Sequence, residues 1–324
     1  MKRRHFLAGL AVLGAPTRAL AQSKDGRVVG ILYLGSESDA AAVAAALRRG
    51  LIERGYLEER DFRLEIRFAN NDAARLRALA RSLVTHGVSV IVTAGTTSAR
   101  AAAAETERVP IVLAASADPV EQGLADSLAR PGRNVTGLSI LGSELIAKRL
   151  ELLRDAIPGA KVAGALLHGA NPGVPIFRHS LERAAAPLGL ELQVIEVRSP
   201  GEIEAAFARF AALGAQSLFV IEDPVFISMT GLMVRLSIQH RLPILTGMLP
   251  MVHAGGLVFY GFDRLELWRR SADFVDRIFK GAVPAEMPIE QPTKFTLVIN
   301  LKTAKALGIS IPQSVLVRAD EIIE

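Results

Sequence analysis

The 324-residue chain contains no cysteine. This absence excludes disulfide bonds, thiolate metal sites, a cysteine nucleophile and a lipidated N-terminal cysteine. Aromatic residues make up only 5% of the chain, which disfavours a sugar-binding site that depends on ring stacking. The sequence also lacks the phosphate-binding loop G-x-x-x-x-G-K-S/T, the dinucleotide motif G-x-G-x-x-G, the zinc motif H-E-x-x-H and the hydrolase motif G-x-S-x-G.

The overall composition is that of a folded protein. Hydrophobic residues account for 50% of the chain and charged residues for 22%, and no low-complexity tract interrupts them. At roughly 100–200 residues per domain, the length favours two domains, each with a buried core.

The first 21 residues have the composition of an export signal. Basic residues at 2–4 precede an apolar run from Phe6 to Ala15, and residues 19–21 have the small-x-small form of a signal-peptidase site. The apolar run is too short to cross a membrane, which takes about 20 residues. We therefore expect residues 1–21 to be a signal peptide that is cleaved between Ala21 and Gln22.

The export route has two candidates. Arg3-Arg4-His5-Phe6-Leu7 resembles the twin-arginine signal, and an ordinary secretory signal is the alternative. Removal of the segment takes away four basic residues and no acidic one, which lowers the formal net charge from +5 to +1. The mature chain then lacks the positive charge that nucleic-acid binding requires. Because no other charge-free apolar stretch reaches spanning length, we expect an exported soluble protein without a membrane anchor.

Short β-rich segments alternate with helical segments from Arg27 almost to the end of the chain. Residues 27–34 are nearly all apolar, as in a buried parallel strand, whereas apolar residues recur every four positions in the helical segment 39–54. The pattern predicts strands at 27–34, 62–68, 88–93, 109–115, 134–140, 161–168, 190–197, 216–222, 243–247, 257–261 and 295–300. It therefore predicts an α/β protein of two doubly wound lobes, each with a parallel sheet covered by helices on both faces.

The turn cluster Pro131-Gly132-Arg133-Asn134 has the weakest periodicity and is the expected crossover between the lobes. In such folds a ligand binds beyond the carboxyl ends of the strands. With two lobes, these ends face each other across a cleft that closes around the ligand.

Four strand-to-helix loops carry polar side chains that suit a ligand. Thr96, Thr97 and Ser98 follow a strand and open an alanine-rich helix, where hydroxyl and backbone N–H groups would hold a carboxylate. Thr97 or Ser98 could equally serve as the N-cap of that helix. Asp118 and Asp223 follow other strands and would bind an ammonium group or simply cap the next helices.

Further candidates lie at the same ends of the strands. Glu222 and Asn171 follow strands of the second lobe, and Ser36 follows the first strand of the chain. Tyr33 and Tyr260 end strands, where each ring could stack on a ligand or pack at the edge of the core.

The histidines do not indicate a metal site, because no two of them have metal-ligand spacing. His168 ends a strand and could face either the cleft or solvent. We expect no metal, no cofactor and no catalytic residue. A hydrolase built on Ser98 or Ser116 with His168 is a remote alternative.

Several segments resemble one bacterial family. Asp118-Pro119-Val120 and the run 130–137 are similar to its DPV…PGxNVTG segment. Its C-terminal pattern GGL…ILKG…P…QPTKF…NLKTA is matched by Gly255–Leu257, Ile278–Gly281, Pro284, Gln291–Phe295 and Asn300–Ala304. From about Arg27 to Glu324 the chain thus resembles the ABC transporter substrate-binding proteins with the type I periplasmic-binding fold, tryptophan/tyrosine-type.

The resemblance implies two lobes joined by several crossovers: residues 27–139 plus 252–284 form lobe 1, and residues 140–251 plus 285–324 form lobe 2. The PGxNVTG segment is expected to serve hinge and loop geometry. One stretch departs from the family, because many members have further polar residues where this chain has Gly169-Ala170-Asn171-Pro172-Gly173.

The expected function is that of a monomeric, non-enzymatic periplasmic receptor. It would capture an amino acid or similar small carboxylate by lobe closure and deliver it to an ABC permease in the inner membrane. An extracytoplasmic sensor that feeds a receptor kinase is the alternative, and the sequence does not separate the two.

Overall fold

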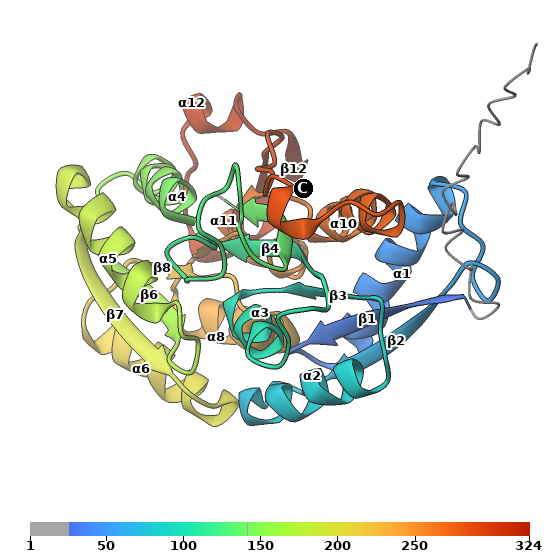
Figure 1. Cartoon of the computed structure of the whole chain (residues 1–324). Coiled ribbons are helices and arrows are strands. Elements are labelled where there is room, and N and C mark those ends of the chain that lie inside the picture. Colours follow the sequence, from blue (N-terminus) through green and yellow to red (C-terminus); the bar gives the residue numbers. More distant parts are fainter. Residues whose placement is uncertain (1–25, 141) are drawn as a thin grey trace, which may run out of the picture.

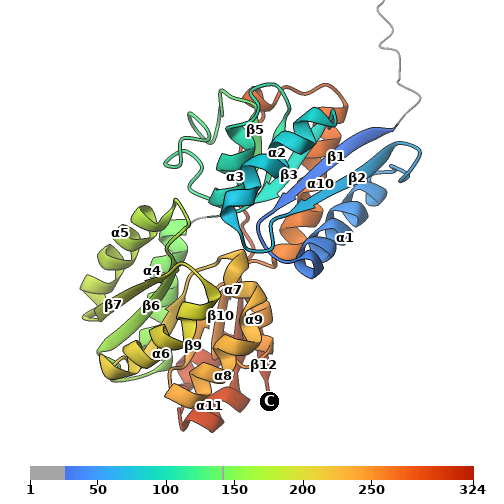
Figure 2. The same cartoon turned by 90° about the horizontal axis from the view of Figure 1, so that it is seen from below.

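The chain is described by a computed structural model that covers residues 26–140 and 142–324. Its strands form two separate sheets, one in each of the two lobes that Figure 2 shows. The first sheet has the order β2-β1-β3-β4-β5, and all of its paired strands are parallel. These strands are β1 (Arg27–Tyr33), β2 (Phe62–Phe68), β3 (Val90–Ala94), β4 (Ile111–Ala117) and β5 (Val135–Ile140).

The second sheet has the order β12-β11-β10-β9-β8-β6-β7. Its strands are β6 (Val162–His168), β7 (Glu191–Val197), β8 (Ser217–Val220), β9 (Ile244–Thr246), β10 (Val258–Gly261), β11 (Thr296–Asn300) and β12 (Glu321–Ile323). The expected two-lobed α/β architecture is confirmed. One pair departs from the expected parallel arrangement, because β10 and β11 are antiparallel, with Gly261 opposite Thr296.

Four long helices cover the first sheet: α1 (Glu37–Glu53), α2 (Leu76–Thr85), α3 (Thr96–Ala103) and α10 (Arg264–Phe279). Val29 and Ile31 of β1 pack in one core cluster with α1 and α10, whereas Val28 and Leu32 pack in another with α2 and α3. The strand is buried on both faces, which explains its unbroken apolar sequence.

The helices of the second lobe are α4 (Gly142–Ala156), α5 (Val174–Ala185), α6 (Ile203–Ala212), α7 (Pro224–Ser228), α8 (Thr230–His240), α9 (Leu249–His253), α11 (Leu301–Leu307) and α12 (Gln313–Leu316) (Figure 1 and Figure 2). Its core joins Leu166 of β6 and Phe219 of β8 to Phe207 of α6 and Leu236 of α8. Short 3₁₀ turns lie at Ala73–Arg75, Ala186–Leu188, Pro200–Glu202 and Pro284–Glu286.

The chain passes between the lobes at three places, and three expectations are corrected. The first crossover lies after β5, not at residues 131–134, because β5 itself pairs with β4. The second lies between β10 and α10, so residues 252–261 belong to the second lobe and not to the first.

The third crossover lies between Glu290 and β11. Glu290 bridges to Leu138, and the backbone N–H of Ile289 donates to the carbonyl of Leu128 at 2.8 Å. Residues 285–290 therefore belong to the first lobe and not, as expected, to the second. The chain therefore re-enters the second lobe from the cleft side. It runs back along β10 in the opposite direction, which explains the antiparallel pair.

The expected signal peptide, residues 1–21, lies outside the described residues. Within residues 26–140 and 142–324, the helices include none with the length and apolar character that crossing a membrane requires.

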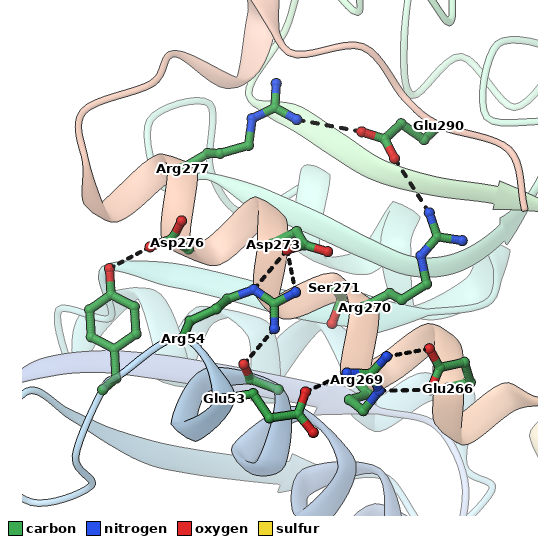
Figure 3. A network of polar contacts seen from close by, with 12 residues as sticks. Glu53, Arg54, Glu266, Arg269, Arg270, Ser271, Asp273, Asp276, Arg277 and Glu290 are labelled. Carbon is green, nitrogen blue, oxygen red and sulfur yellow. Dashed lines mark hydrogen bonds and ion pairs between the residues drawn. The ribbon is translucent and has the colours of Figure 1, made fainter.

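Helix α10 is anchored to α1 although more than 200 residues separate them in the chain. Figure 3 shows the ion pairs of Arg269 with Glu53 and of Arg54 with Asp273 at this interface. The two helices approach closely at Gly50, where a Cβ would overlap the carbonyl oxygen of Arg269 and lie 2.8 Å from the Cβ of Ala272.

This close approach predicts that Gly50→Ala lowers the free energy of unfolding by about 1–3 kcal/mol through overpacking. Urea denaturation measures the change. Gly231 is a matched control, since it is also a helical glycine but has no atom within 4 Å of the place that a Cβ would occupy. Gly231→Ala should leave stability unchanged or slightly raised, because alanine favours helix. Equal effects of the two substitutions would contradict the close approach.

Candidate functional site

A cleft of about 650 Å³ lies between the lobes, beyond the carboxyl ends of the parallel strands. Seven of the candidate residues line it, and they come from both lobes: Tyr33, Thr96, Thr97, Ser98, Asn171, Glu222 and Asp223. The other three candidates, Ser36, Asp118 and Tyr260, are not part of its lining.

The N-terminus of α3 opens into the cleft without a side-chain cap. Gly95 is the N-cap residue, and its φ of 77° suits glycine. The Oγ1 atom of Thr97 and the Oγ atom of Ser98 are buried, and neither has a hydrogen-bond partner in the described part of the chain. The alternative in which Thr97 or Ser98 caps the helix is therefore wrong. Two hydroxyls and the positive end of the helix remain available to an anion.

The opposite wall carries a charged pair that sequence reasoning found only in part. The side chain of Arg149 in α4 is 1% exposed, and that of Glu222 is 26% exposed. Arg149 Nη1 donates to Glu222 Oε2 at 2.7 Å, Nη2 donates to Oε1, and Nε donates to the carbonyl of Tyr260 at 2.6 Å. A Cβ at position 247 would overlap both charged groups, so Gly247 makes room for the pair.

Asp223 is held by its own lobe. Its Oδ1 accepts from the backbone N–H of Val225 at 3.0 Å and caps α7, while Oδ2 accepts from Nδ2 of Asn171 at 3.0 Å. His168 is buried, with Nδ1 3.2 Å from the same Oδ2 but not aligned for a hydrogen bond. His168 thus faces neither solvent nor an open site. The capping role of Asp223 is present alongside its place in the cleft wall.

At the lobe-1 side, Tyr33 contacts a second arginine that the sequence analysis did not find. Arg264 Nη1 lies 3.3 Å from the Tyr33 hydroxyl, to which it donates. Burial raises the pKa of Tyr33 to about 12 against the opposing charge of Arg264, so the hydroxyl stays protonated at neutral pH. The Tyr33 ring packs edge-on against the buried Trp268, 6.2 Å away between centroids.

Two candidates outside the cleft have structural contacts. Ser36 caps α1, because its Oγ accepts from the backbone N–H of Asp39 at 3.3 Å and donates to Oδ2 of Asp39 at 2.7 Å. The ring of Tyr260 stacks on Phe295 with 5.6 Å between centroids.

Asp118 lies next to the first crossover, close to Gly142, and is not part of the cleft lining. Its φ of 43° is in the left-handed region, and its Oδ2 atom is buried without a hydrogen-bond partner among the described residues. A Cβ at Gly142 would lie 2.5 Å from this oxygen. Burial, followed by the charges of Glu121 and Glu144, raises the pKa of Asp118 to about 6.

The rest of the cleft is mostly apolar. Its apolar side chains come from both lobes and include Leu34, Ile140, Leu145, Ile146, Phe177, Ile221, Ile227, Met248, Leu249, Phe262 and Leu267. A ligand that fills this volume would place a large apolar group against them.

Comparisons with known proteins show the family to which this chain belongs. A sequence profile described as ABC transporter substrate binding protein matches residues 29–323. The chain belongs to this family. A relative, the Tyrosine-binding protein of Clostridioides difficile (strain R20291), is 26% identical over 285 residues, which cover 88% of this chain and 82% of that protein.

Two solved structures are similar over nearly their whole length. One is an ABC domain from Streptococcus pneumoniae in complex with L-Trp, with 26% identity, a TM-score of 0.85, and 92% of this chain and 100% of that chain covered. The other is a conserved domain protein from Vibrio cholerae, with 27% identity, a TM-score of 0.86, and 91% and 99% covered. The similarity confirms the expected type I periplasmic-binding fold.

Membership of this family makes the chain a binding protein and not an enzyme. The hydrolase alternative built on Ser98 or Ser116 with His168 is therefore wrong. A search of residues 26–140 and 142–324 finds no cluster of three or more His, Asp or Glu side chains that could hold a metal ion.

The two arginines of the cleft lie in helices, whereas the sequence analysis examined strand ends. The position of Arg149 in the sequence indicates its role. It occupies the apolar stripe of α4 that Leu145, Ile146, Leu152 and Leu153 share, and a charge on a buried stripe needs a partner.

Asp118 gives a prediction for the pH dependence of stability. The pKa of Asp118 is about 3.9 in the unfolded chain and is raised to about 6 in the folded protein. The stability that the protonated carboxyl contributes is therefore fully present below about pH 3.9 and is lost as the pH rises through about 6. Asn is neutral and tolerates a positive φ. We expect Asp118→Asn to raise the melting temperature more at about pH 7.5 than at about pH 4. If the difference in melting temperature between Asp118→Asn and the unmodified protein does not vary with pH, Asp118 is not buried as an ionisable group.

Proposed function

We propose that this protein is the periplasmic component of an ABC uptake transporter and captures aromatic L-amino acids by closure of its two lobes. A small-molecule substrate follows from the family, whose members act outside the cytoplasm. The proposal includes a signal peptide at residues 1–21 that is cleaved between Ala21 and Gln22. It also includes a monomeric state and delivery of the ligand to an inner-membrane permease. The observation that carries it is the pair of hydroxyls of Thr97 and Ser98. Both are buried in a cleft with mostly apolar walls, and neither has a hydrogen-bond partner among the residues that the structure describes.

The charge distribution of the cleft matches a zwitterion. On lobe 1, the hydroxyls of Thr97 and Ser98 and the N-terminus of α3 suit the carboxylate of the ligand. On lobe 2, Glu222 and Asp223 form an acidic wall. Glu222 in this wall is already paired with Arg149, so Asp223 is the carboxylate that suits the ammonium group of the ligand. This division keeps the expected carboxylate site, and at the ammonium site it keeps Asp223 and leaves out Asp118.

The apolar lining favours a large hydrophobic side chain on the ligand. The volume of about 650 Å³ falls in the range of small-molecule sites. Phe177 and Phe262 provide aromatic surface from opposite lobes. Two similar proteins support the aromatic class, because one is named a Tyrosine-binding protein and the other was solved in complex with L-Trp.

Closure is supported by a side-chain hydrogen bond between the lobes. Ser228 at the end of α7 donates to Oδ2 of Asp39 in the first turn of α1 at 3.1 Å, and it also contacts the carbonyl of Pro224 at 3.2 Å. Both ends of this bond lie near residues of the cleft wall, since α7 begins beside Asp223 and α1 follows Tyr33. A bond of this kind forms only when the lobes are together.

A thermal-shift panel tests the function. L-tryptophan and L-tyrosine should raise the melting temperature, with about 2.7 kcal/mol of stabilisation at 100 times the dissociation constant. Ser98→Ala should weaken binding about tenfold, because a hydrogen bond to a charged group is lost. Ser116→Ala is the matched control, since its hydroxyl is also buried and unpartnered but lies outside the cleft lining. If no aromatic amino acid binds, the proposed function is wrong.

The interlobe bond gives a separate prediction. Ser228→Ala should weaken L-tryptophan binding about three- to tenfold by lowering the closed population, with most of the change in the dissociation rate. Thr230→Ala removes a nearby hydroxyl that bonds within lobe 2, to the carbonyl of Ile227 at 2.8 Å, and should bind normally. Stopped-flow kinetics and small-angle scattering measure both effects. Unchanged dissociation from Ser228→Ala would rule out the role of this bond in closure.

A further inference from the structure

We infer that Arg264 is a carboxylate-binding residue of the cleft, acting together with the N-terminus of α3. The inference rests on the proposed function and names a residue that determines which ligands are accepted. It makes a carboxylate group necessary for tight binding, beyond the need for an aromatic side chain.

The first observation is the pairing of charges in the cleft. Three basic side chains line it: Arg149, His253 and Arg264. Arg149 is paired with Glu222, and His253 Nε2 lies 3.3 Å from Glu321 Oε1. As far as the structure describes the chain, Arg264 has no carboxylate partner, and its guanidinium donates a hydrogen bond to the hydroxyl of Tyr33. A cation in a cleft without an acidic partner is suited to an anionic ligand.

The second observation is the position of Arg264 in its helix. It is the first residue of α10, where the helix dipole disfavours a positive charge. The neighbouring Asp263 does not compensate by pairing with it, because its carboxylate accepts from the backbone N–H groups of Leu265 at 2.8 Å and Glu266 at 3.4 Å. Violations of a local rule of this kind are expected at functional sites.

The other arginines of α10 show the contrast. Arg269 pairs with Glu53 and Glu266, and Arg270 and Arg277 pair with Glu290. Figure 3 shows these three side chains with their acidic partners. Among residues 26–140 and 142–324, the arginine of α10 that lacks a carboxylate partner is thus the one that lines the cleft.

The third observation places Arg264 on the same side of the cleft as α3. Tyr33, which accepts from Arg264, ends β1, and β3 is its neighbour in the sheet, with Leu32 opposite Thr93. The helix α3 begins three residues later, at Thr96. One carboxylate in the lobe-1 half of the cleft would therefore have the hydroxyls of α3 and the guanidinium of Arg264 as its donors. Tyr33 is buried and holds the guanidinium in place.

Isothermal titration of the full mature chain with L-tryptophan tests the inference. Arg264→Gln should weaken binding at least tenfold, which corresponds to about 1.4 kcal/mol. Arg264→Lys should have an intermediate effect, because it keeps the charge and loses the planar fork. Arg270→Gln on the same helix is the matched control and should bind like the unmodified protein. The melting temperature without ligand should be unchanged or higher in Arg264→Gln, since a cation leaves the positive end of α10.

L-tryptophan methyl ester separates carboxylate recognition from a structural role. Its affinity should change by less than twofold between the unmodified protein and Arg264→Gln, because the ester carries no negative charge. The inference is overturned if Arg264→Gln binds L-tryptophan within twofold of the unmodified protein, or if acid and ester lose affinity by the same factor. If the unmodified protein binds no aromatic amino acid, the proposed function fails and this inference falls with it.

Discussion

The buried guanidinium of Arg149 is the contact on which the geometry of the cleft depends. It lies on α4, directly after the first crossover, and it binds Glu222 at the end of β8 and the carbonyl of Tyr260 just before the second crossover. One side chain thus ties two of the three connections between the lobes to the acidic wall. Breaking a buried pair of this kind costs about 3–5 kcal/mol, because the remaining charge is left without a partner. Gly247 is the sequence feature that permits the arrangement, since any side chain there would occupy the space of the charged groups.

With that wall fixed, the two lobes present opposite chemistry to a ligand. Lobe 1 offers donors, namely the open N-terminus of α3 and the guanidinium of Arg264, whereas lobe 2 offers the carboxylate of Asp223 beside the Arg149–Glu222 pair. An amino acid bound between them would be attracted to both lobes and would bring them together. In the proposed function, the ligand would strengthen a closed state that the bond between Ser228 and Asp39 would also stabilise, which is how binding energy shifts a two-state equilibrium.

The periodicity of apolar residues predicted every strand of both sheets except the short edge strand β12, because a strand buried on two faces, such as β1, has an unbroken apolar sequence. Polar residues at strand ends likewise led to Thr97 and Glu222. Two kinds of feature could not be read in this way. The lobe to which β10 belongs is set by its pairing with β9 and β11. No local pattern of apolar residues indicates this pairing. Arg264 lies at the start of a helix, and its lack of a carboxylate partner within the described part of the chain becomes visible only in the folded structure.

The segment that identified the family has a structural role, which explains why it specifies a fold and not a ligand. Asn134 Nδ2 donates to the carbonyls of Thr106 at 3.0 Å and Val109 at 2.8 Å, and Thr136 Oγ1 donates to the carbonyl of Met287 at 2.9 Å. Gly137 has a φ of 128° and lies so close to the backbone of Leu113 that no side chain fits. These contacts hold β5 in the first sheet and hold the segment around Met287, which precedes the third crossover, against it. Asp118 lies next to Gly142, at the first crossover. Because such residues set the path of the chain between the lobes, they are required whatever solute is bound. The choice of solute is left to the cleft-lining side chains outside this motif.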